Sequence, residues 1–249
     1  MRLLDLHNTS TEIRAARPAM AVFGIGAIEQ HSAHLPLATD WIWADAVSRM
    51  VARELDALLL PALPFSMSQC HGPEPGTVWL RPETLAAVLR DVVHALQEQG
   101  IHQVVIINGH GGNPVLEPAI EELNRTCPDM MVIVPEFYGG AEVAALFDHA
   151  AVDVHAGEME TSFMLALCPE LVGPQRPDCV PDVGRNFFDY AFLPRWTADG
   201  VLGVASAASV EKGRRALQVL AQKMAREVRE TIACWSALRA QHPAESEDS

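Results

Sequence analysis

The chain has 249 residues, of which 49% are hydrophobic, so it can bury one large core, and we expect a single domain over residues 1–243. Its formal net charge of −14 at pH 7 opposes binding to nucleic acid and to anionic membrane surfaces. The acidic, polar residues 244–249 have nothing to bury and are expected to be disordered.

Short apolar runs alternate with segments of helical spacing along the chain. The predicted strands are rich in Val, Ile and Leu and cover residues 20–28, 57–63, 103–108 and 130–136. The predicted helices cover residues 45–55, 83–99 and 114–126 and, after a loop-rich segment over 169–203, residues 211–240. Continuous apolar strands of this kind are typical of a parallel sheet that is covered on both faces. The pattern predicts an α/β fold with a mostly parallel central sheet.

The N-terminal segment and the cysteines favour a cytoplasmic protein without a membrane partner. Asp5 interrupts the stretch in which a signal peptide would need an apolar core, and no apolar run approaches the roughly 20 residues of a membrane span. The five cysteines are scattered and form no CxxC pair, which argues against a disulfide framework and against a thiolate zinc site. We therefore expect reduced thiols.

The loop after the first predicted strand carries several potential metal ligands. Ligands bind outside the carboxyl ends of strands in open parallel sheets, so the loops that follow the strands deserve inspection. In the stretch GIGAIEQHSAHLPLATD, Glu29 and His31 are two residues apart, a spacing that places both side chains on one side of an extended chain. Asp40 follows at a distance that allows its carboxylate to return to the same point. A polar loop rich in hydrogen-bonding groups is the alternative interpretation.

Two further stretches carry histidines and acids. INGHGGN follows the third predicted strand and places three glycines around His110, but it lacks the GxxxxGK[ST] and GxGxxG patterns of phosphate loops. A glycine turn with an incidental histidine is the alternative there. In HAGEMETS, His155 precedes Glu158 and Glu160, and only one of these acids can reach a shared ion if a helix begins at this point. Capping of that helix by the acids is the competing explanation.

Together the three stretches predict a divalent metal site. Histidines and carboxylates from separate loops suit Zn²⁺, Mn²⁺ or Fe²⁺ better than Ca²⁺ or a thiolate zinc finger. The two carboxylate oxygens of Asp40 could bridge two ions roughly 3.5 to 4 Å apart, the separation found in two-metal hydrolases.

The chain resembles the creatininase (creatinine amidohydrolase) family, which includes formamide deformylases and the mycofactocin precursor peptidase. The resemblance rests on EQHSAHLPLATD, PGT, NGHGGN and HAGEMETS in the family's order, and weakly on GVLGVASAASVEKG. It implies a three-layer α/β/α fold, a homo-oligomer that is often a hexamer, and two divalent ions per chain. It also implies hydrolysis of a small-molecule amide, cyclic amide or formamide C–N bond by a metal-activated water.

The resemblance also assigns roles to individual residues. Glu29, His31, Asp40 and His110 resemble the family's metal ligands, with Asp40 as the bridge. Creatininase itself has an acid two residues after the histidine of NGH, where this chain has Gly112. The remaining carboxylate is therefore expected from the ETS motif.

In that motif Glu160 is the expected ligand and a catalytic residue, with Glu158 as the reserve ligand. A tryptophan of the creatinine pocket corresponds to Ala151 here, so creatinine is not the expected substrate. His155 resembles the proton shuttle that protonates the leaving nitrogen, for which an imidazole has a suitable pKa.

Other histidines and other functions stay open at this point. His34 and His71 lie in motif loops and are expected as pocket walls. A creatininase-like peptidase for short peptides is one alternative function. A nucleotide-binding module that uses the NGHGGN loop is a second, and a catalytically silent oligomeric scaffold is a third.

Overall fold

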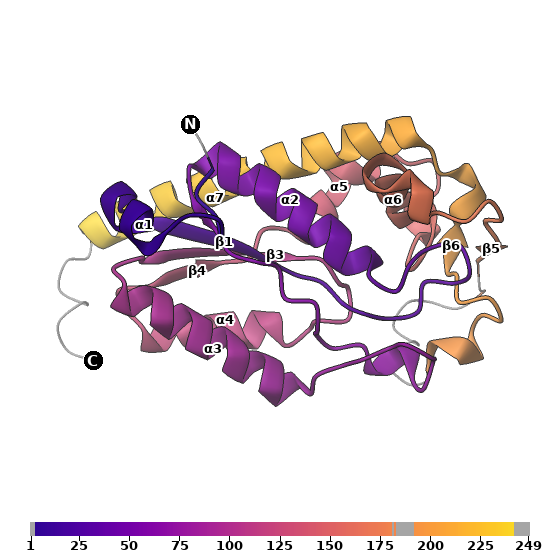
Figure 1. The fold of residues 1–249 in the computed structure, drawn as a ribbon, viewed down its shortest axis with the longest axis horizontal. Coiled ribbons are helices and arrows are strands. Elements are labelled where there is room, and N and C mark those ends of the chain that lie inside the picture. The colour runs from indigo at the N-terminus through magenta and orange to yellow at the C-terminus, as the bar shows by residue number, and fades with distance from the viewer. Residues whose placement is uncertain (1–2, 181, 183–191, 242–249) are drawn as a thin grey trace.

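Four parallel strands form the central sheet of the computed structural model, which describes residues 3–180, 182 and 192–241 (Figure 1). The sheet has the order β2-β1-β3-β4, formed by β1 (Met20–Ile25), β2 (Leu58–Leu59), β3 (Gln103–Asn108) and β4 (Met131–Ile133). β1 pairs with β3 along its whole length. The predicted α/β fold with a parallel sheet is confirmed, while the acidic tail predicted at residues 244–249 lies outside the described residues.

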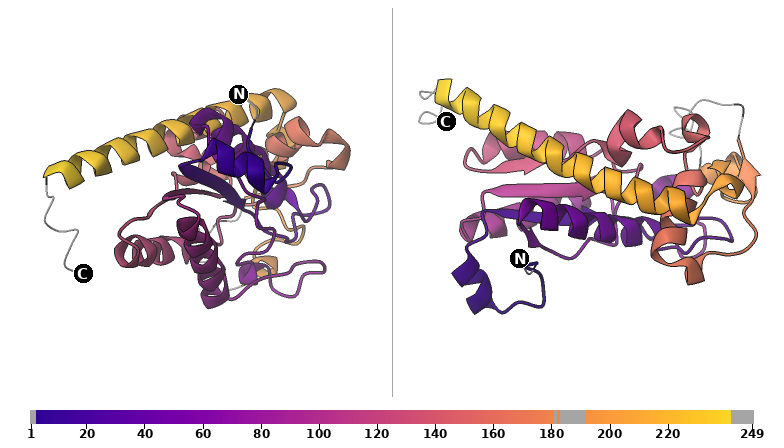
Figure 2. Two further views of the ribbon diagram at one scale, coloured as in Figure 1. Left: turned by 60° about the vertical axis from the view of Figure 1, so that its left-hand side comes forward. Right: turned by 90° about the horizontal axis from the view of Figure 1, so that it is seen from above.

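Helices cover both faces of this sheet and create three layers (Figure 1). One face carries α2 (Thr39–Leu55), α5 (Gly140–Ala144), α6 (Glu158–Leu167) and the long α7 (Val210–Gln241). The other face carries α3 (Pro82–Glu98) and α4 (Leu116–Thr126). α7 runs beside α2 along the length of the molecule (Figure 2). A short helix, α1 (Ser10–Ala16), precedes β1, and β5 (Asp178–Cys179) pairs antiparallel with β6 (Gly203–Val204).

The strands are apolar throughout because each of their faces packs against a different helical layer. Val22 of β1 and Val105 of β3 belong to the core beneath α2 and α7. Their chain neighbours Phe23 and Ile106 belong to the core against α3 and α4. Alternate residues of a strand point to opposite faces, so two cores require an uninterrupted apolar run.

The observed elements differ from the predicted ones mainly at their ends. β2 is shorter than the apolar run at 57–63, since Pro61 has no N–H to donate to the sheet. The chain nevertheless continues beside β1, because the N–H of Leu63 donates to Gly24 O. α2 begins at Thr39, earlier than the predicted residue 45, and this places Asp40 in its first turn.

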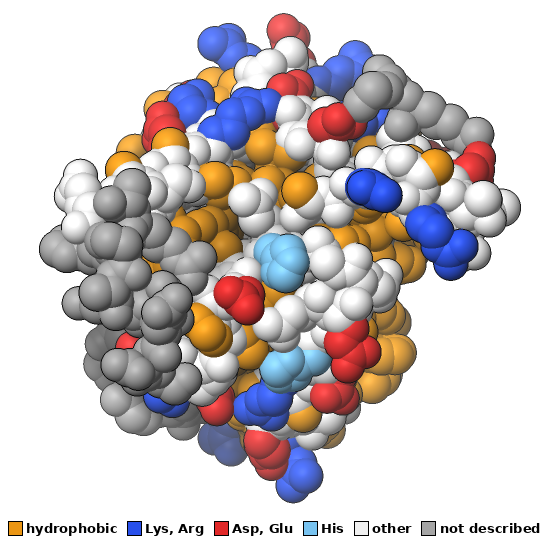
Figure 3. Space-filling model, turned by 90° about the vertical axis from the view of Figure 1, so that its left-hand side faces the viewer, with side chains coloured by type: hydrophobic (Ala, Val, Ile, Leu, Met, Phe, Trp, Pro, Cys, Tyr) orange, Lys and Arg blue, Asp and Glu red, His pale blue; other side chains and the backbone are white. Residues whose placement is uncertain are grey.

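The loops after β1 and β3 converge at the carboxyl edge of the sheet, and α1 and the end of α7 lie at the opposite end (Figure 1). Figure 3 views that opposite end, where acidic, basic and apolar side chains are interspersed. Each helix in the described parts of the chain is too short or too polar to span a bilayer. All five cysteines are free, as expected for reduced thiols.

Candidate metal centre

The predicted site residues converge at the carboxyl edge of the sheet. Glu29 and His31 lie in the loop after β1, and Asp40 lies in the first turn of α2. His110 follows β3, and Glu160 lies in the first turn of α6. All five side chains are buried. Segments that are far apart in the sequence therefore supply one compact polar cluster in the protein interior.

Asp40 lies at the centre of this cluster. Its Oδ1 is 3.2 Å from His31 Nε2, and its Oδ2 is 2.9 Å from His110 Nδ1. On the His31 side, Glu160 Oε2 lies 3.6 Å from the same Nε2. Glu29 Oε2 lies 3.3 Å from the other ring nitrogen of His110, Nε2. The carboxylate of Asp40 thus lies between the two imidazoles, and a further carboxylate lies beside each ring.

Backbone carbonyls fix which ring nitrogen of His31 and His110 carries the proton. His31 Nδ1 lies 3.1 Å from Glu29 O, and His110 Nε2 lies 2.6 Å from Met67 O. A carbonyl oxygen only accepts, so these nitrogens donate. In the neutral rings the other nitrogens are bare and face Asp40. This is the arrangement of metal-binding histidines, in which one ring nitrogen donates to the protein and the other binds the ion.

The cluster requires positive charge at its centre. Both Glu29 carboxylate oxygens and Asp40 Oδ2 are buried and make no hydrogen bond, a costly arrangement for carboxylates. Burial lowers the pKa of His31, but the carboxylates of Asp40, Glu160 and Glu29 exceed this effect and raise it to about 10. In the same way the pKa of His110 is raised to about 9.

Either protons or divalent cations can satisfy this demand. Two histidines and three carboxylates form a donor set that fits Zn²⁺, Mn²⁺ or Fe²⁺. The residues present therefore fit a metal centre.

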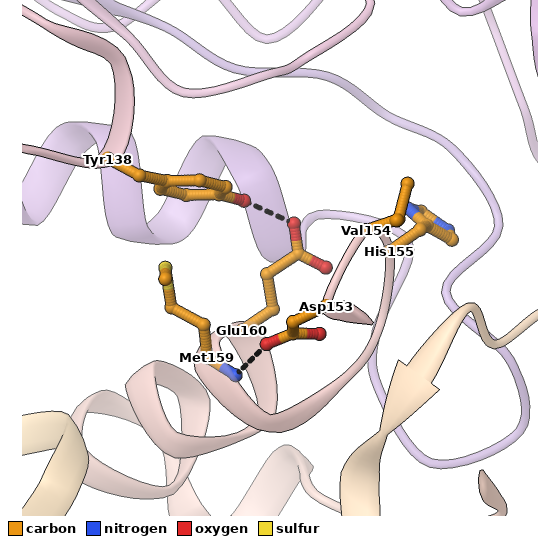
Figure 4. Close-up of a pocket in the computed structure, with 6 residues that line it drawn as sticks. All are labelled: Tyr138, Asp153, Val154, His155, Met159 and Glu160. Atoms are coloured by element: carbon orange, nitrogen blue, oxygen red, sulfur yellow. Dashed lines mark hydrogen bonds between the residues drawn. The ribbon is translucent and has the colours of Figure 1, made fainter. Parts of the chain in front are cut away.

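The carboxylate of Glu160 is held from both sides, and Figure 4 shows the contact with Tyr138. The Tyr138 hydroxyl donates to Oε1 at 2.5 Å, and the Ala156 N–H donates to Oε2 at 2.6 Å. Both donors have left-handed backbone, with φ of 53° at Tyr138 and 51° at Ala156, which is strained for residues other than glycine. Burial raises the pKa of Glu160 to about 7, although His31 opposes the shift.

Glu158 points away from this cluster. Its carboxylate pairs with the Lys212 ammonium and accepts the His149 N–H at 2.8 Å. Residues two apart on a helix lie on different sides, so only one of the two acids reaches the histidines. The structure brings Glu160 to the cluster and places Glu158 in a contact between α6 and α7. Lys212 belongs to the SVEKG stretch, which the sequence left without a role.

The other three histidines of the motif loops, His155, His71 and His34, contact different residues. His155 Nδ1 lies 3.7 Å from Glu29 Oε1, and burial together with His31 and His71 holds the pKa of His155 well below its ordinary value. His71 was expected only as a pocket wall, yet its Nε2 lies 3.0 Å from Glu29 Oε1. The one sequence signal for His71 was its place just before PGT. His34 lies against α6, where its Nε2 is 3.0 Å from the Thr161 hydroxyl.

The space around Gly112 explains why this chain has no acid at the position where creatininase has one. A Cβ at this position would overlap the His110 ring, which occupies the space next to Met67 O. An acid cannot be accommodated there while His110 keeps this place. Ala151, which corresponds to a tryptophan of creatininase, lies exposed in a short 3₁₀ helix (Ala150–Val152).

A buried cluster of imidazoles and carboxylates at the carboxyl edge of a parallel sheet defines this chain as an α/β protein with a candidate centre for divalent ions. The family model described as "Creatininase: Creatinine amidohydrolase" matches residues 6–228. The chain belongs to the creatininase family, as its motifs predicted.

Known members of the family resemble the chain over most of its length. It is 31% identical to creatinine amidohydrolase of Pseudomonas putida, covering 87% of this chain and 91% of that protein. It is 28% identical to the mycofactocin precursor peptide peptidase of Mycobacterium ulcerans, covering 84% and 83%. A creatininase variant of zinc–zinc type has a TM-score of 0.77 at 30% identity, covering 93% of this chain and 99% of that chain. These relatives are hydrolases, and the chain is an enzyme of this family.

Proposed function

We propose that the chain is a metal-dependent amidohydrolase that cleaves an amide, cyclic amide or formamide C–N bond in a small molecule. The observation that carries the proposal is the Asp40 carboxylate, whose two oxygens face His31 and His110 from opposite sides. Asp40 Oδ1, His31 and Glu160 would hold one divalent ion. Asp40 Oδ2, His110 and Glu29 would hold the other. The zinc–zinc type of the similar creatininase variant supports such a pair.

Two ions at such a site supply an activated water and polarise the carbonyl that is attacked. The protein excludes bulk water, because the ligands are buried, and Tyr138 and Ala156 keep Glu160 in place. His155 lies beside the cluster, with its ring centroid 4.3 Å from that of His31. Since burial favours the neutral imidazole, His155 would first accept a proton and then pass it to the leaving nitrogen.

Elemental analysis of purified protein tests the metal part of this proposal. The unmodified chain should bind two divalent ions, and Asp40→Ala should lose both because each ion shares this carboxylate. Asp45→Ala is the matched control: Asp45 lies in the same helix and pairs with Arg49 at 3.7 Å, away from the site. Retention of both ions by Asp40→Ala would remove the bridging role of Asp40.

Cleavage of short peptides is the second candidate, favoured by the similarity to the mycofactocin precursor peptide peptidase. The metal-loaded protein should be assayed side by side on formamides, cyclic amides and short peptides. Turnover of peptides alone would select the peptidase. Tight NAD or ATP binding without bound metal would instead support a nucleotide-binding module, and complete metal loading without turnover of any of these substrates would support a silent scaffold.

We also propose a homo-oligomer, with a hexamer as the expected form, in the cytoplasm. Large apolar side chains are exposed in and near the loops that follow β1 and β2, namely Leu37, Trp41, Phe65, Val78 and Trp79. Light scattering during size-exclusion chromatography measures the molar mass in solution, and a monomeric mass would contradict the oligomer.

A further inference from the structure

Gln30 stands between Glu29 and His31, and the structure fixes the orientation of its side-chain amide. Its Oε1 accepts the Ser32 N–H at 3.0 Å, and its Nε2 donates to Gly200 O at 3.3 Å. Exchanging oxygen and nitrogen would place a donor against the Ser32 N–H and an acceptor against the Gly200 carbonyl. Gly200 also leaves room for this side chain, since a Cβ there would overlap Gln30 Oε1.

The backbone carbonyl of Gln30 determines the tautomer of His155. His155 Nε2 lies 2.8 Å from Gln30 O, and a carbonyl oxygen accepts hydrogen bonds only. The ring proton of neutral His155 is therefore on Nε2. Its Nδ1 is bare and faces the cluster, 3.7 Å from Glu29 Oε1.

The side-chain amide of Gln30 determines the tautomer of His71. Gln30 Nε2 lies 3.1 Å from His71 Nδ1 and 3.2 Å from His155 Nε2. Because His155 Nε2 already carries a proton, the two amide hydrogens go to His71 Nδ1 and to Gly200 O. His71 Nδ1 then accepts, and the ring proton of His71 is on Nε2, which faces Glu29 Oε1 at 3.0 Å.

We propose that Gln30 is a positioning residue that gives these two histidines different tasks. Through its side chain it puts the ring proton of His71 on Nε2, the nitrogen that faces Glu29 Oε1. Through its backbone carbonyl it keeps Nδ1 of His155 bare and directed toward the cluster. The expected effect on turnover rests on the proposed hydrolase function, whereas the two tautomers do not depend on it.

Ring ¹⁵N spectra of the zinc-loaded protein with labelled histidine test the tautomers directly, because a protonated and a bare ring nitrogen have well-separated chemical shifts. His71→Asn and His155→Asn variants identify the two sets of signals. We expect the proton on Nε2 in both rings of the unmodified protein. A proton on Nδ1 of either ring would overturn the proposal.

Gln30→Glu tests whether Gln30 is the cause. The introduced carboxylate cannot donate, so the ring proton of His71 should move to Nδ1, while the backbone carbonyl keeps His155 unchanged. Zinc content should be retained. Loss of an orienting partner of this kind typically costs about 10- to 100-fold in activity, and we expect kcat to fall by that amount with a smaller change in KM.

Gln69→Glu is the matched control, because the Gln69 amide donates to Leu80 O at 2.9 Å in the same segment as His71 without touching the histidines. This variant should keep the His71 spectrum and kcat. An unchanged His71 ring in Gln30→Glu, or loss of zinc from that variant, would refute the positioning role. Lack of hydrolysis by the unmodified protein would instead count against the proposed function, since the ring spectra need no substrate.

Discussion

Asp153 lies at the start of α6, where its Oδ2 accepts the Met159 N–H at 2.6 Å (Figure 4). A Cβ at Gly157 or Gly203 would overlap its Oδ1, so backbone encloses the other side of the carboxylate. Burial raises the pKa of Asp153 to about 6; the Met159 N–H opposes this shift and the Glu158 carboxylate adds to it. Around pH 5 the folded protein without metal therefore holds a proton on Asp153 that the unfolded chain has released.

This proton gives the direction and size of a pH effect on stability. The ordinary pKa is 3.8 and the folded value is about 6, a difference of about 2 units. At 1.36 kcal/mol per unit, ionised Asp153 costs the folded state about 3 kcal/mol. A raised acid pKa means that the free energy of unfolding falls as pH rises from about 4 to about 6 and then levels off. Asp153→Asn carries no charge and can still accept the Met159 N–H.

Asp153→Asn should therefore match the unmodified protein near pH 4 and be more stable by about 2 to 3 kcal/mol at pH 8. Urea unfolding of chelator-treated protein, followed by tryptophan fluorescence across this pH range, measures the difference. Asp129→Asn removes the same charge from an exposed turn and is the control for the loss of a charge alone. Parallel curves for Asp153→Asn and the unmodified protein would refute the reasoning.

Four further predictions concern the site. His155→Ala should keep its metal and lose about 10²- to 10⁴-fold in kcat on an ordinary amide, but less on an activated anilide whose leaving group needs little protonation. Equal losses on both substrates, or loss of metal, would argue against a proton shuttle. The metal-loaded protein should hydrolyse creatinine weakly or not at all, and turnover of creatinine at the rate of the best amide would contradict this expectation. Gly112→Glu should lower the metal content, because the introduced side chain displaces the His110 ring; a full metal content in this variant would contradict that reasoning. Tyr138→Phe should lower the free energy of unfolding of the metal-free protein by about 1.5 to 3 kcal/mol, because the buried carboxylate of Glu160 loses a hydrogen-bond donor. Urea unfolding measures this difference, and an unchanged free energy of unfolding would show that the hydroxyl does not hold Glu160.

The sheet was predictable from sequence because each strand is buried on both faces. The run at 103–108 coincides with β3, since every residue between its ends has to face one of two cores. The apolar pattern was weaker in helices that pack against the core on one side only, and at the ends of elements that lead into a loop. α2 begins at Thr39 and not at the predicted residue 45, and its N-cap residue, Ala38, has no capping side chain that could mark this start in the sequence. α1 and α5 are short, and the sequence did not reveal them.

The motifs indicated which side chains gather at the candidate site but not the hydrogen bonds that orient them. The two-residue spacing brought Glu29 and His31 together as predicted, since it depends on local geometry. The contact between Gln30 and Gly200 joins residues that are 170 positions apart, and no local pattern reports it. For the same reason His71 was expected as a pocket wall, although its ring faces Glu29.

Gly112 shows how one missing side chain constrains the rest of the centre. The His110 ring fills the space that a Cβ would need and donates to Met67 O from there, so residue 112 cannot be an acid while His110 keeps this place. The carboxylate beside His31 comes instead from α6. On that helix Glu160 faces His31, while Glu158, two positions earlier, pairs with Lys212. Lys212→Met leaves the buried Glu158 carboxylate without its ammonium partner and should shift the first turn of α6, which carries Glu160, and so lower the metal content; an unchanged metal content would show that this pair does not help to place Glu160.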